Sequence, residues 1–261
     1  RVAKQLKPYV ESKLILELTG FSKPTSTLSF PVLTDHFLKA NKNRSKNTQD
    51  LYEYVLRSYN SGKPLPTNPN SRAIFVRTIN ACWNWGLKTG LIDKANKLVE
   101  DTKGVARQRV YSKDELDLMF NEIRDDDFNR FVKFAYYTGA RSGEIRHIQP
   151  QNLSDGSLVA FGKTGRRIIK ISTQASTLIA KQSPLWNYSK DYVSHHFKKE
   201  VRRLGIKDAR FHDLRRTFGL NLIKQGMSIY KVSKLLGHKS VRTTEQHYAP
   251  LLTVEIEDFE L

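Results

Sequence analysis

The stretch from Phe211 to Pro250 constrains the chain most, because it places polar, reactive side chains at the ends of three short helices. In the first helix an apolar residue recurs at every fourth position, which predicts one buried stripe. The residues of this stripe are Leu214, Phe218 and Leu222. His212 and Arg215 are three residues apart, so we expect them to share a face of that helix away from the stripe.

Two more helices are predicted in the same stretch. The second consists of apolar residues at helical spacing up to Gly237, which ends it, so that His238 follows the helix directly. The third is expected to begin near Ser240 and to end by Pro250, with Tyr248 in its last turn. The pattern therefore predicts two histidines, an arginine and a phenol held on the ends of rigid elements around one point.

The charge of the chain indicates a polyanionic partner. Its 44 lysines and arginines against 26 acidic residues give a formal net charge of +18, which is typical of proteins that bind nucleic acid. A basic surface that serves solubility is the plainer alternative, and an anionic membrane is a third, although no amphipathic basic helix stands out. No apolar run is long enough to span a membrane, and the single Cys82 suits a reducing compartment. The chain starts at Arg1 without a signal-peptide pattern, which leaves room for a domain upstream.

The chain is predicted to form two domains. Residues 1–100 contain helical apolar spacing and are expected to form a helical domain, with 1–30 the hardest part to assign. Residues 101–110 are polar and basic and are interpreted as a linker. Residues 111–261 form the second domain, in which Ser112 and Glu115 have the spacing of a capping box.

The second domain is also expected to contain a small β-hairpin. Two strand-like runs, 157–161 and 167–171, flank a glycine-rich turn that places Lys163 at the hairpin tip. Before this hairpin, a helix breaks at Thr138-Gly139, and Arg141 follows the break. The predicted fold is therefore mainly α with a small antiparallel β-sheet, an α+β class.

These residue types suit the transfer of a phosphodiester between two hydroxyl groups. Arg141 and Arg215 are the candidates for stabilising the phosphate, because a planar guanidinium binds two phosphate oxygens at once. His212 and His238 are expected to donate hydrogen bonds or to exchange protons near neutral pH. Each residue alone also fits a plain structural role, and their occurrence together favours the site.

Tyr248 is the predicted nucleophile. Its ordinary pKa is about 10, and neighbouring cations are expected to lower it. Lys163 is expected to protonate the leaving hydroxyl. Because the guanidiniums take the role that metal ions have elsewhere, we predict no metal and no cofactor; the acidic run Asp125–Asp127 is interpreted as a helix cap.

These motifs resemble those of the tyrosine recombinases, the phage-type integrases in particular. TGARSGEI (Thr138–Ile145) is similar to the first-arginine motif of that family, and HDLRRTF (His212–Phe218) to its H-x-x-R box. LGHKS (Leu236–Ser240) and HYAP (His247–Pro250) are similar to its closing motif, and GKTG (Gly162–Gly165) to its hairpin lysine. The residues also follow the family order of Arg, Lys, His, Arg, His and Tyr.

The resemblance covers Tyr111 to Pro250 well and residues 31–100 more weakly. It implies a helical domain that binds the DNA core site and a catalytic domain, closing around double-stranded DNA at a specific site like a clamp. It implies that Tyr248 attacks one strand, leaving a 3′-phosphotyrosyl bond and a free 5′-hydroxyl. Four protomers would then exchange strands through a Holliday junction, whereas the free protein would be a monomer or weak oligomer.

The implied protein is a site-specific recombinase or integrase that acts on intracellular DNA, away from membranes, and integrates or excises a mobile element. A type IB topoisomerase would use the same chemistry, and a relative that binds DNA without cutting it is the alternative from another class. The acidic and apolar tail, 251–261, is expected to dock on a neighbouring protomer or to pack on its own domain.

A set of basic residues in the first domain is expected to contact DNA phosphates, which would position the protein without reading sequence. These residues are Lys42, Arg44, Lys46, Arg72 and Arg77. A solvated basic face is an equal alternative. If the contacts form, affinity should fall steeply with added salt.

Overall fold

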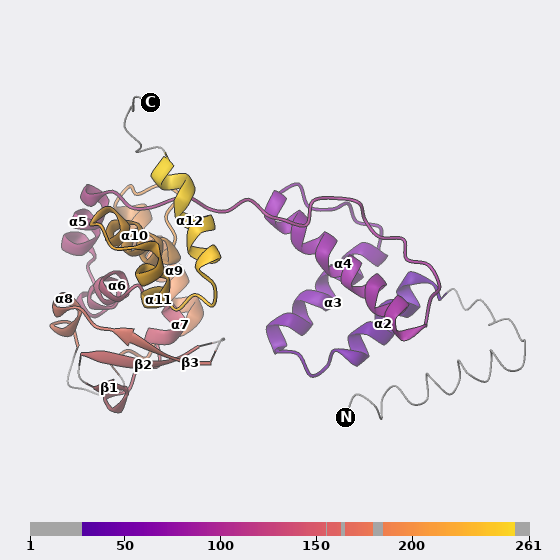
Figure 1. The fold of residues 1–261 in the computed structure, drawn as a ribbon, viewed down its shortest axis with the longest axis horizontal. Coiled ribbons are helices and arrows are strands. Elements are labelled where there is room, and N and C mark those ends of the chain that lie inside the picture. Colours follow the sequence, from indigo (N-terminus) through magenta and orange to yellow (C-terminus); the bar gives the residue numbers. More distant parts are fainter. Residues whose placement is uncertain (1–27, 155, 163–164, 180–184, 254–261) are drawn as a thin grey trace, which may run out of the picture. The chain divides into compact units, whose positions relative to one another are not determined.

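A computed structural model describes residues 28–154, 156–162, 165–179 and 185–253. The chain divides into two compact units, one up to Val105 and the other from Ala106 (Figure 1). The boundary falls inside the predicted linker. The predicted fold class, mainly helical with a small antiparallel sheet, is confirmed.

The first unit is helical over its described residues, as the apolar spacing predicted. Its helices are α2 (Phe30–Ala40), α3 (Lys46–Asn60) and α4 (Pro69–Thr89). Asn68 caps the start of α4 by accepting from two backbone N–H groups, and Gly90 ends it in the left-handed conformation at φ 69°. The core between the helices includes Leu33, Leu56, Ile79 and Trp83.

The second unit packs its helices around one apolar core. The helices of its first two thirds are α5 (Lys113–Glu122), α6 (Asp126–Thr138), α7 (Ser142–Ile145), α8 (Thr173–Ser176), α9 (Lys190–Arg203) and α10 (Phe211–Lys224). Ser112 and Glu115 form the predicted capping box of α5, and Asp125 caps α6 by accepting from Phe128 N. Phe131, Trp186 and other large side chains fill the core between α6, α9 and α10.

The β-hairpin forms as predicted, and an unpredicted strand extends it. Among the described residues, β1 (Leu153–Ser154), β2 (Ser157–Gly162) and β3 (Gly165–Lys170) make an antiparallel sheet in that order, after the short 3₁₀ helix η1 (Pro150–Asn152). The strands lie side by side at one edge of the unit, next to α7 (Figure 1). Lys163 lies outside the described residues.

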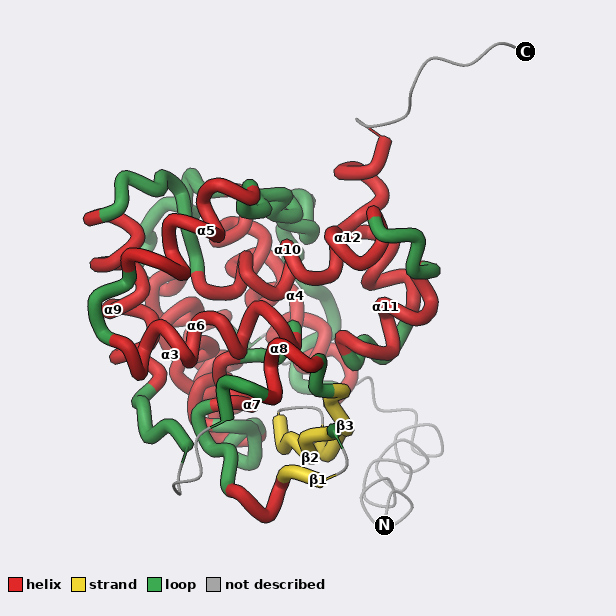
Figure 2. The backbone as a smooth tube through the Cα atoms, turned by 90° about the vertical axis from the view of Figure 1, so that its left-hand side faces the viewer, coloured by secondary structure: helices red, strands yellow, loops and turns green. Residues whose placement is uncertain are grey.

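The last two helices are α11 (Ile229–Leu236) and α12 (Val241–Thr253), which lie side by side (Figure 2). Gly237 ends α11 in the left-handed conformation, as predicted. The prediction that Pro250 ends α12 is wrong, since Pro250 lies inside the helix. A proline removes one N–H donor, but Leu251 and Leu252 pack on a small apolar cluster and hold the final turn in place. Residues 254–261 of the tail lie outside the described residues.

Candidate active site

Arg215 is held at the centre of the candidate site by backbone carbonyls from two different elements. Its Nη1 donates to Gly139 O over 2.5 Å, and its Nη2 donates to Leu236 O. Gly139 precedes the loop of Arg141, and Leu236 ends the helix that precedes His238. Burial and neighbouring positive charges lower the pKa of Arg215 to about 9, so the guanidinium stays charged at neutral pH.

Arg141 stands at the start of α7 and is fixed by Glu144. One Glu144 carboxylate oxygen accepts from Arg141 N over 2.7 Å, and the other accepts from Arg141 Nη1 over 2.9 Å. The Arg141 side chain remains 36% exposed, so part of its guanidinium is open to a ligand, whereas Glu144 is 2% exposed. The prediction that Glu144 orients the Arg141 loop therefore agrees with its contacts.

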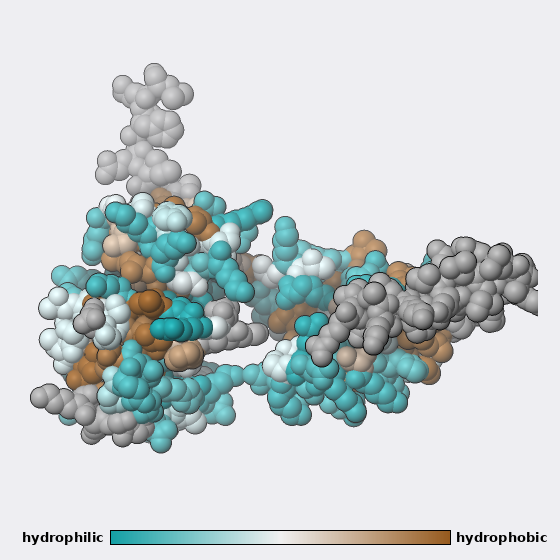
Figure 3. Space-filling view, turned by 60° about the horizontal axis from the view of Figure 1, so that its bottom comes forward, coloured by the Kyte–Doolittle hydropathy of each residue, from teal (hydrophilic) through white to brown (hydrophobic). Residues whose placement is uncertain are grey.

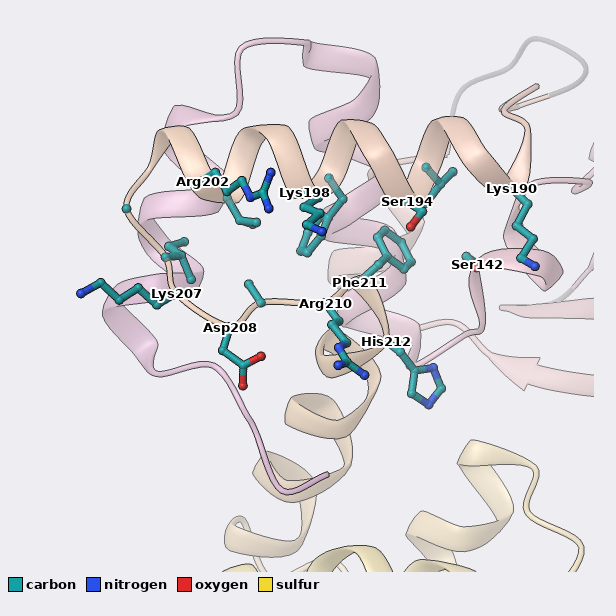
Figure 4. A pocket seen from close by; sticks show the side chains of 16 residues that line it. Ser142, Lys190, Ser194, Lys198, Arg202, Lys207, Asp208, Arg210, Phe211 and His212 are labelled. Carbon is teal, nitrogen blue, oxygen red and sulfur yellow. The ribbon is translucent and has the colours of Figure 1, made fainter. Parts of the chain in front are cut away.

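His212 lies in the first turn of α10, with its ring exposed at one end of a groove (Figure 4). Desolvation by the surrounding protein lowers its pKa to about 4, and the charges of Arg215 and Arg216 add to this shift. His212 is therefore a neutral imidazole at neutral pH, and not the titrating group that the sequence led us to expect.

His238 follows Gly237 and is oriented by α12. Its Nδ1 lies 2.7 Å from the Oγ1 of Thr244, a fully buried residue. Burial, followed by the charges of Arg215 and Arg141, lowers the pKa of His238 to about 4. His238 is thus also neutral at neutral pH, with its Nε2 outside the bond to Thr244.

Tyr248 is packed in an apolar cluster with Leu220, Val232 and Leu236, and is 3% exposed. A Cβ added to Gly219 of α10 would overlap the Tyr248 hydroxyl, so the phenol occupies the space that this glycine leaves. The nearby arginines act in the expected direction, but the expectation of a net fall in its pKa is wrong for this arrangement. Burial outweighs the nearby arginines and raises the pKa of Tyr248 to about 12.

Arg167 of β3 joins the ion pairs around Glu144, although the sequence placed it only at the start of a strand-like run. Its side chain is 11% exposed and pairs with Glu144 over 2.7 Å. The alternation of faces along β3 could have indicated that Arg167 is not a plain surface residue. Arg167 and the buried Ile169 are two residues apart, so they share a face of the strand. Glu144, between Arg141 and Arg167, has its pKa lowered to about 2, since these hydrogen bonds outweigh its burial.

A second ion cluster ties the start of this unit to α10. Asp213, a buried residue between His212 and Arg215, accepts from Arg107 Nη2 over 2.8 Å and from Arg216 Nη1 over 2.7 Å. Arg107 also pairs with Asp208. Part of the predicted linker is therefore fastened to the helix that carries two candidate residues.

A groove of about 870 Å³ leads along α9 to His212 (Figure 4). One wall presents an exposed polar or basic residue at every fourth position of the helix. These residues are Lys190, Ser194, Lys198 and Arg202. Lys207 and Arg210 line the groove from the following loop, and Ser142, next to Arg141, lines it on the side of His212 (Figure 4). The groove therefore joins a basic surface to the candidate site.

The basic residues predicted in the first unit are partly engaged within the protein. Arg72 pairs with Glu100 over 2.5 Å, Lys46 pairs with Asp50 over 2.8 Å, and Arg77 donates to a backbone carbonyl. Arg44 makes a weak contact of 3.4 Å with Asn41, while Lys42 lies on the exposed surface nearby. Hydrophilic residues cover most of the visible face of this unit (Figure 3).

Metal and membrane features were also sought in the part of the chain that the structure describes. No group of three or more His, Cys, Asp or Glu side chains there is arranged to hold a metal ion. No helix among the same residues combines the length and apolar character that crossing a membrane requires.

Sequence comparison relates the chain to known recombinases. Residues 110–253 match the phage integrase family. The chain is 24% identical over 154 residues to tyrosine recombinase XerA of Saccharolobus solfataricus, covering 54% of this chain and 53% of that protein. It is 22% identical over 208 residues to tyrosine recombinase XerC of Staphylococcus aureus, covering 69% of this chain and 70% of that protein. The chain thus spans about half the length of the first relative.

Solved structures share the fold. A lambda integrase (75–356) dimer bound to a COC′ core site matches with a TM-score of 0.72 and 18% identity, covering 88% of this chain and 98% of that one. The Tn1549 transposon integrase in complex with a circular intermediate DNA matches with a TM-score of 0.65 and 13% identity, covering 88% and 100%. At these identities the likeness establishes the architecture alone.

Proposed function

The chain belongs to the phage integrase family, and on that premise we propose that it is a site-specific DNA recombinase of the tyrosine type. The observation that carries the proposal is the pair of hydrogen bonds from Arg215, which joins the Arg141 loop to the helix end before His238. A phosphate at this junction would lie among two guanidiniums and two neutral imidazoles. Preorganised donors of this kind stabilise the charge that develops on a phosphate in its transition state.

The proposed reaction exchanges one phosphoester for another. The Tyr248 oxygen attacks the phosphorus, the bond to the 5′-oxygen breaks, and a 3′-phosphotyrosyl bond forms. The phenol proton passes to a neutral imidazole, for which His238 is our candidate because Thr244 orients its Nδ1 and its Nε2 lies outside that bond. Lys163 supplies the proton to the leaving 5′-hydroxyl, and attack by a 5′-hydroxyl reverses the sequence and rejoins the strand.

Tyr248 must leave its apolar position before it reacts, because a phenol that is 3% exposed cannot reach a DNA phosphate. We propose that DNA binding shifts α12 and brings the hydroxyl toward Arg215. The charges of Arg215 and Arg216 already lower the pKa of Tyr248 against the effect of burial. Exposure would therefore leave a phenol that is more acidic than it is in the free protein.

Double-stranded DNA is the proposed substrate, and the groove along α9 is its proposed track into the site. Lys190, Lys198 and Arg202 project from one wall of this groove, which ends at His212 (Figure 4). The first unit would act as the core-binding domain through Lys42, Arg44 and Lys46, which lie on its exposed surface. We further propose a tetramer on synapsed DNA and a role in moving a mobile element.

A nicked suicide substrate tests the chemistry. Because the target sequence is unknown, the substrate is a pool of nicked duplexes with randomised sequence around the nick, incubated with the intact protein and with Tyr248→Phe. We expect a covalent protein–DNA adduct on a denaturing gel with the intact protein and none with the variant.

Three other results would overturn parts of the proposal. An adduct with both proteins would assign the nucleophile to another tyrosine. DNA binding without any adduct would indicate a non-catalytic relative. Relaxation of supercoiled plasmid without sequence preference would indicate a topoisomerase instead of a recombinase.

A further inference from the structure

Arg167 uses all three guanidinium nitrogens to bind protein acceptors on two elements outside its own strand. Its Nε donates to Glu144 Oε1 over 2.8 Å, and its Nη2 donates to Glu144 Oε2 over 2.7 Å. Its Nη1 donates to Leu235 O over 3.0 Å. A planar fork satisfies both carboxylate oxygens and a carbonyl at once, which the single ammonium of a lysine cannot do.

These contacts reach separate parts of the candidate site. Glu144 holds the Arg141 loop through its backbone and its guanidinium. Leu235 lies at the end of α11, next to Leu236, whose carbonyl accepts from Arg215. Arg167 therefore fastens the helix end before His238 at a carbonyl adjacent to the one that Arg215 binds.

Arg167 also fixes the strand that leads out of the hairpin tip. It pairs with Ala160 across the β2–β3 ladder, and Gly162 pairs with Gly165 at the last described rung before the tip. Lys163 follows Gly162 in the chain. The side chain that anchors Glu144 and Leu235 O is thus only a few residues from the proposed general acid.

Gly237 makes room for this arrangement. It adopts φ 63°, which favours glycine, and a Cβ built on it would lie 2.7 Å from the Arg167 Cδ. The glycine that ends α11 therefore serves two purposes. It turns the chain toward His238, and it leaves space for the methylene groups of Arg167.

We propose that Arg167 is a positioning residue that aligns the Arg141 loop and the helix end before His238 on one phosphate. The proposal rests on the proposed function. Because its side chain is only 11% exposed and its guanidinium faces Glu144 and Leu235 O, we assign Arg167 a role through these groups and not a contact with the phosphate.

The first test separates DNA binding from cleavage, using Arg167→Lys and Arg167→Gln. A matched control is Arg166→Gln, which removes an exposed arginine from the adjacent position on the other face of β3. For Arg167→Gln we expect affinity for a nicked duplex to stay within about threefold, while the single-turnover rate of adduct formation falls about 10–100-fold, as for residues that orient primary ligands. Arg167→Lys should recover part of the rate, and Arg166→Gln should leave it near that of the intact protein.

The second test does not depend on cleavage. Arg215, Arg141, His247 and Arg167 all place positive charge around His238. In the DNA-free protein, Arg167→Gln should therefore raise the pKa of His238 in an NMR titration, and Arg167→Lys, which keeps the charge, should shift the His238 resonances with less change in pKa.

The two tests fail in different ways. If the intact protein formed no adduct while the His238 signals responded as expected, the proposed function would be wrong and the positioning contact would stand. If His238 were unchanged in both Arg167 variants, or if loss of rate followed loss of DNA affinity alone, the positioning role would be wrong. Arg167→Lys keeps the ion pair with Glu144 and guards against a variant that fails to fold.

Discussion

Arg215 and Tyr248 belong to the same candidate site but are held by different kinds of contact. Arg215 is fixed by hydrogen bonds to Gly139 O and Leu236 O, and the neighbouring Arg141 by hydrogen bonds to Glu144. Tyr248 is fixed by apolar packing, with its hydroxyl over Gly219. Hydrogen bonds define direction and distance, whereas apolar packing defines only burial.

This difference indicates which part of the site is preformed. Arg215 and Arg141, the proposed phosphate-binding groups, are held in place without DNA, because each polar contact would leave an unpaired partner if it broke. Releasing one large apolar side chain costs about 1.5–3 kcal/mol. DNA binding can supply that amount, and we therefore propose that Tyr248, the proposed nucleophile, is the part that moves.

The largest effect on the cleavage rate is expected from Arg215→Lys, which removes hydrogen bonds of the preformed part of the site. A lysine cannot bridge Gly139 O and Leu236 O, so a buried carbonyl loses its donor and the phosphate loses a guanidinium. The cleavage rate should fall about 10²–10³-fold, as when one transition-state donor is removed. Stability should fall by about 1–3 kcal/mol. Adduct formation and urea unfolding measure the two effects.

Arg202→Lys is the matched control, because Arg202 is an exposed groove residue with the same chemistry. We expect its cleavage rate at saturating DNA to match that of the intact protein. A near-normal rate for Arg215→Lys would contradict the distinction between a preformed Arg215 and a mobile Tyr248.

A smaller effect is expected from Arg107→Gln, which loosens the anchor of α10. Asp213 would keep Arg216 as a partner, so the cost should be about 2 kcal/mol, below that of leaving a buried charge wholly unpaired. Urea unfolding of Arg107→Gln, Asp213→Asn and the double variant measures the coupling. Lys103→Gln, a nearby exposed change, is the control. Additive effects would show that the contact does not secure the helix.

The pH dependence of stability tests the partly buried His238. His238 has a pKa of about 4 in the folded protein, against 6.5 ordinarily. Between these values the unfolded chain binds a proton that the folded protein does not, so stability is full above pH 6.5 and falls as the pH drops toward 4. Glu144, lowered from 4.5 to about 2, should cause a further loss between those values.

Urea unfolding across this pH range measures both windows. His238→Asn should remove the uptake of about one proton from the upper window. His212 should contribute less than its pKa suggests, because its ring is exposed and water screens it. An unchanged slope for His238→Asn would contradict the burial of a neutral imidazole.

Local features of the sequence were enough to predict most helices and to select Arg141, Arg215 and His238 as candidates. Gly237 and the Ser112–Glu115 capping box act within one turn of chain, so their effect is readable from a few neighbours. Arg215 donates to Gly139 O and Leu236 O, each two residues before Arg141 and His238, at the helix ends that the sequence indicated.

Contacts between distant residues were not predictable in the same way. Arg107 and Asp213 are 106 residues apart, and no local pattern indicates which acid a given arginine will bind. Whether Tyr248 points into the protein depends on Gly219, in another helix. The cation effect on its pKa was correctly signed, but its size against burial required the packing to be known.

The smallest expected effect on the rate of adduct formation, and the most direct test of a mobile nucleophile, comes from Gly219→Ala. Gly143→Ala is the matched control, since both glycines are helical but a Cβ at Gly143 meets nothing within 4 Å. Each alanine gains about 1 kcal/mol of helix propensity. Overlap with Tyr248 should make Gly219→Ala less stable than the control by about 1–3 kcal/mol.

The displaced phenol should also become more acidic. In Gly219→Ala the pKa of Tyr248 should fall from about 12 toward 10, followed by NMR of ring-labelled tyrosine with Tyr248→Phe for assignment. Because the buried position competes with the reactive one, adduct formation should be as fast as in the intact protein or several-fold faster. A slower reaction with Tyr248 still buried would mean that the apolar position is part of the working site, and that both halves of the site are equally fixed.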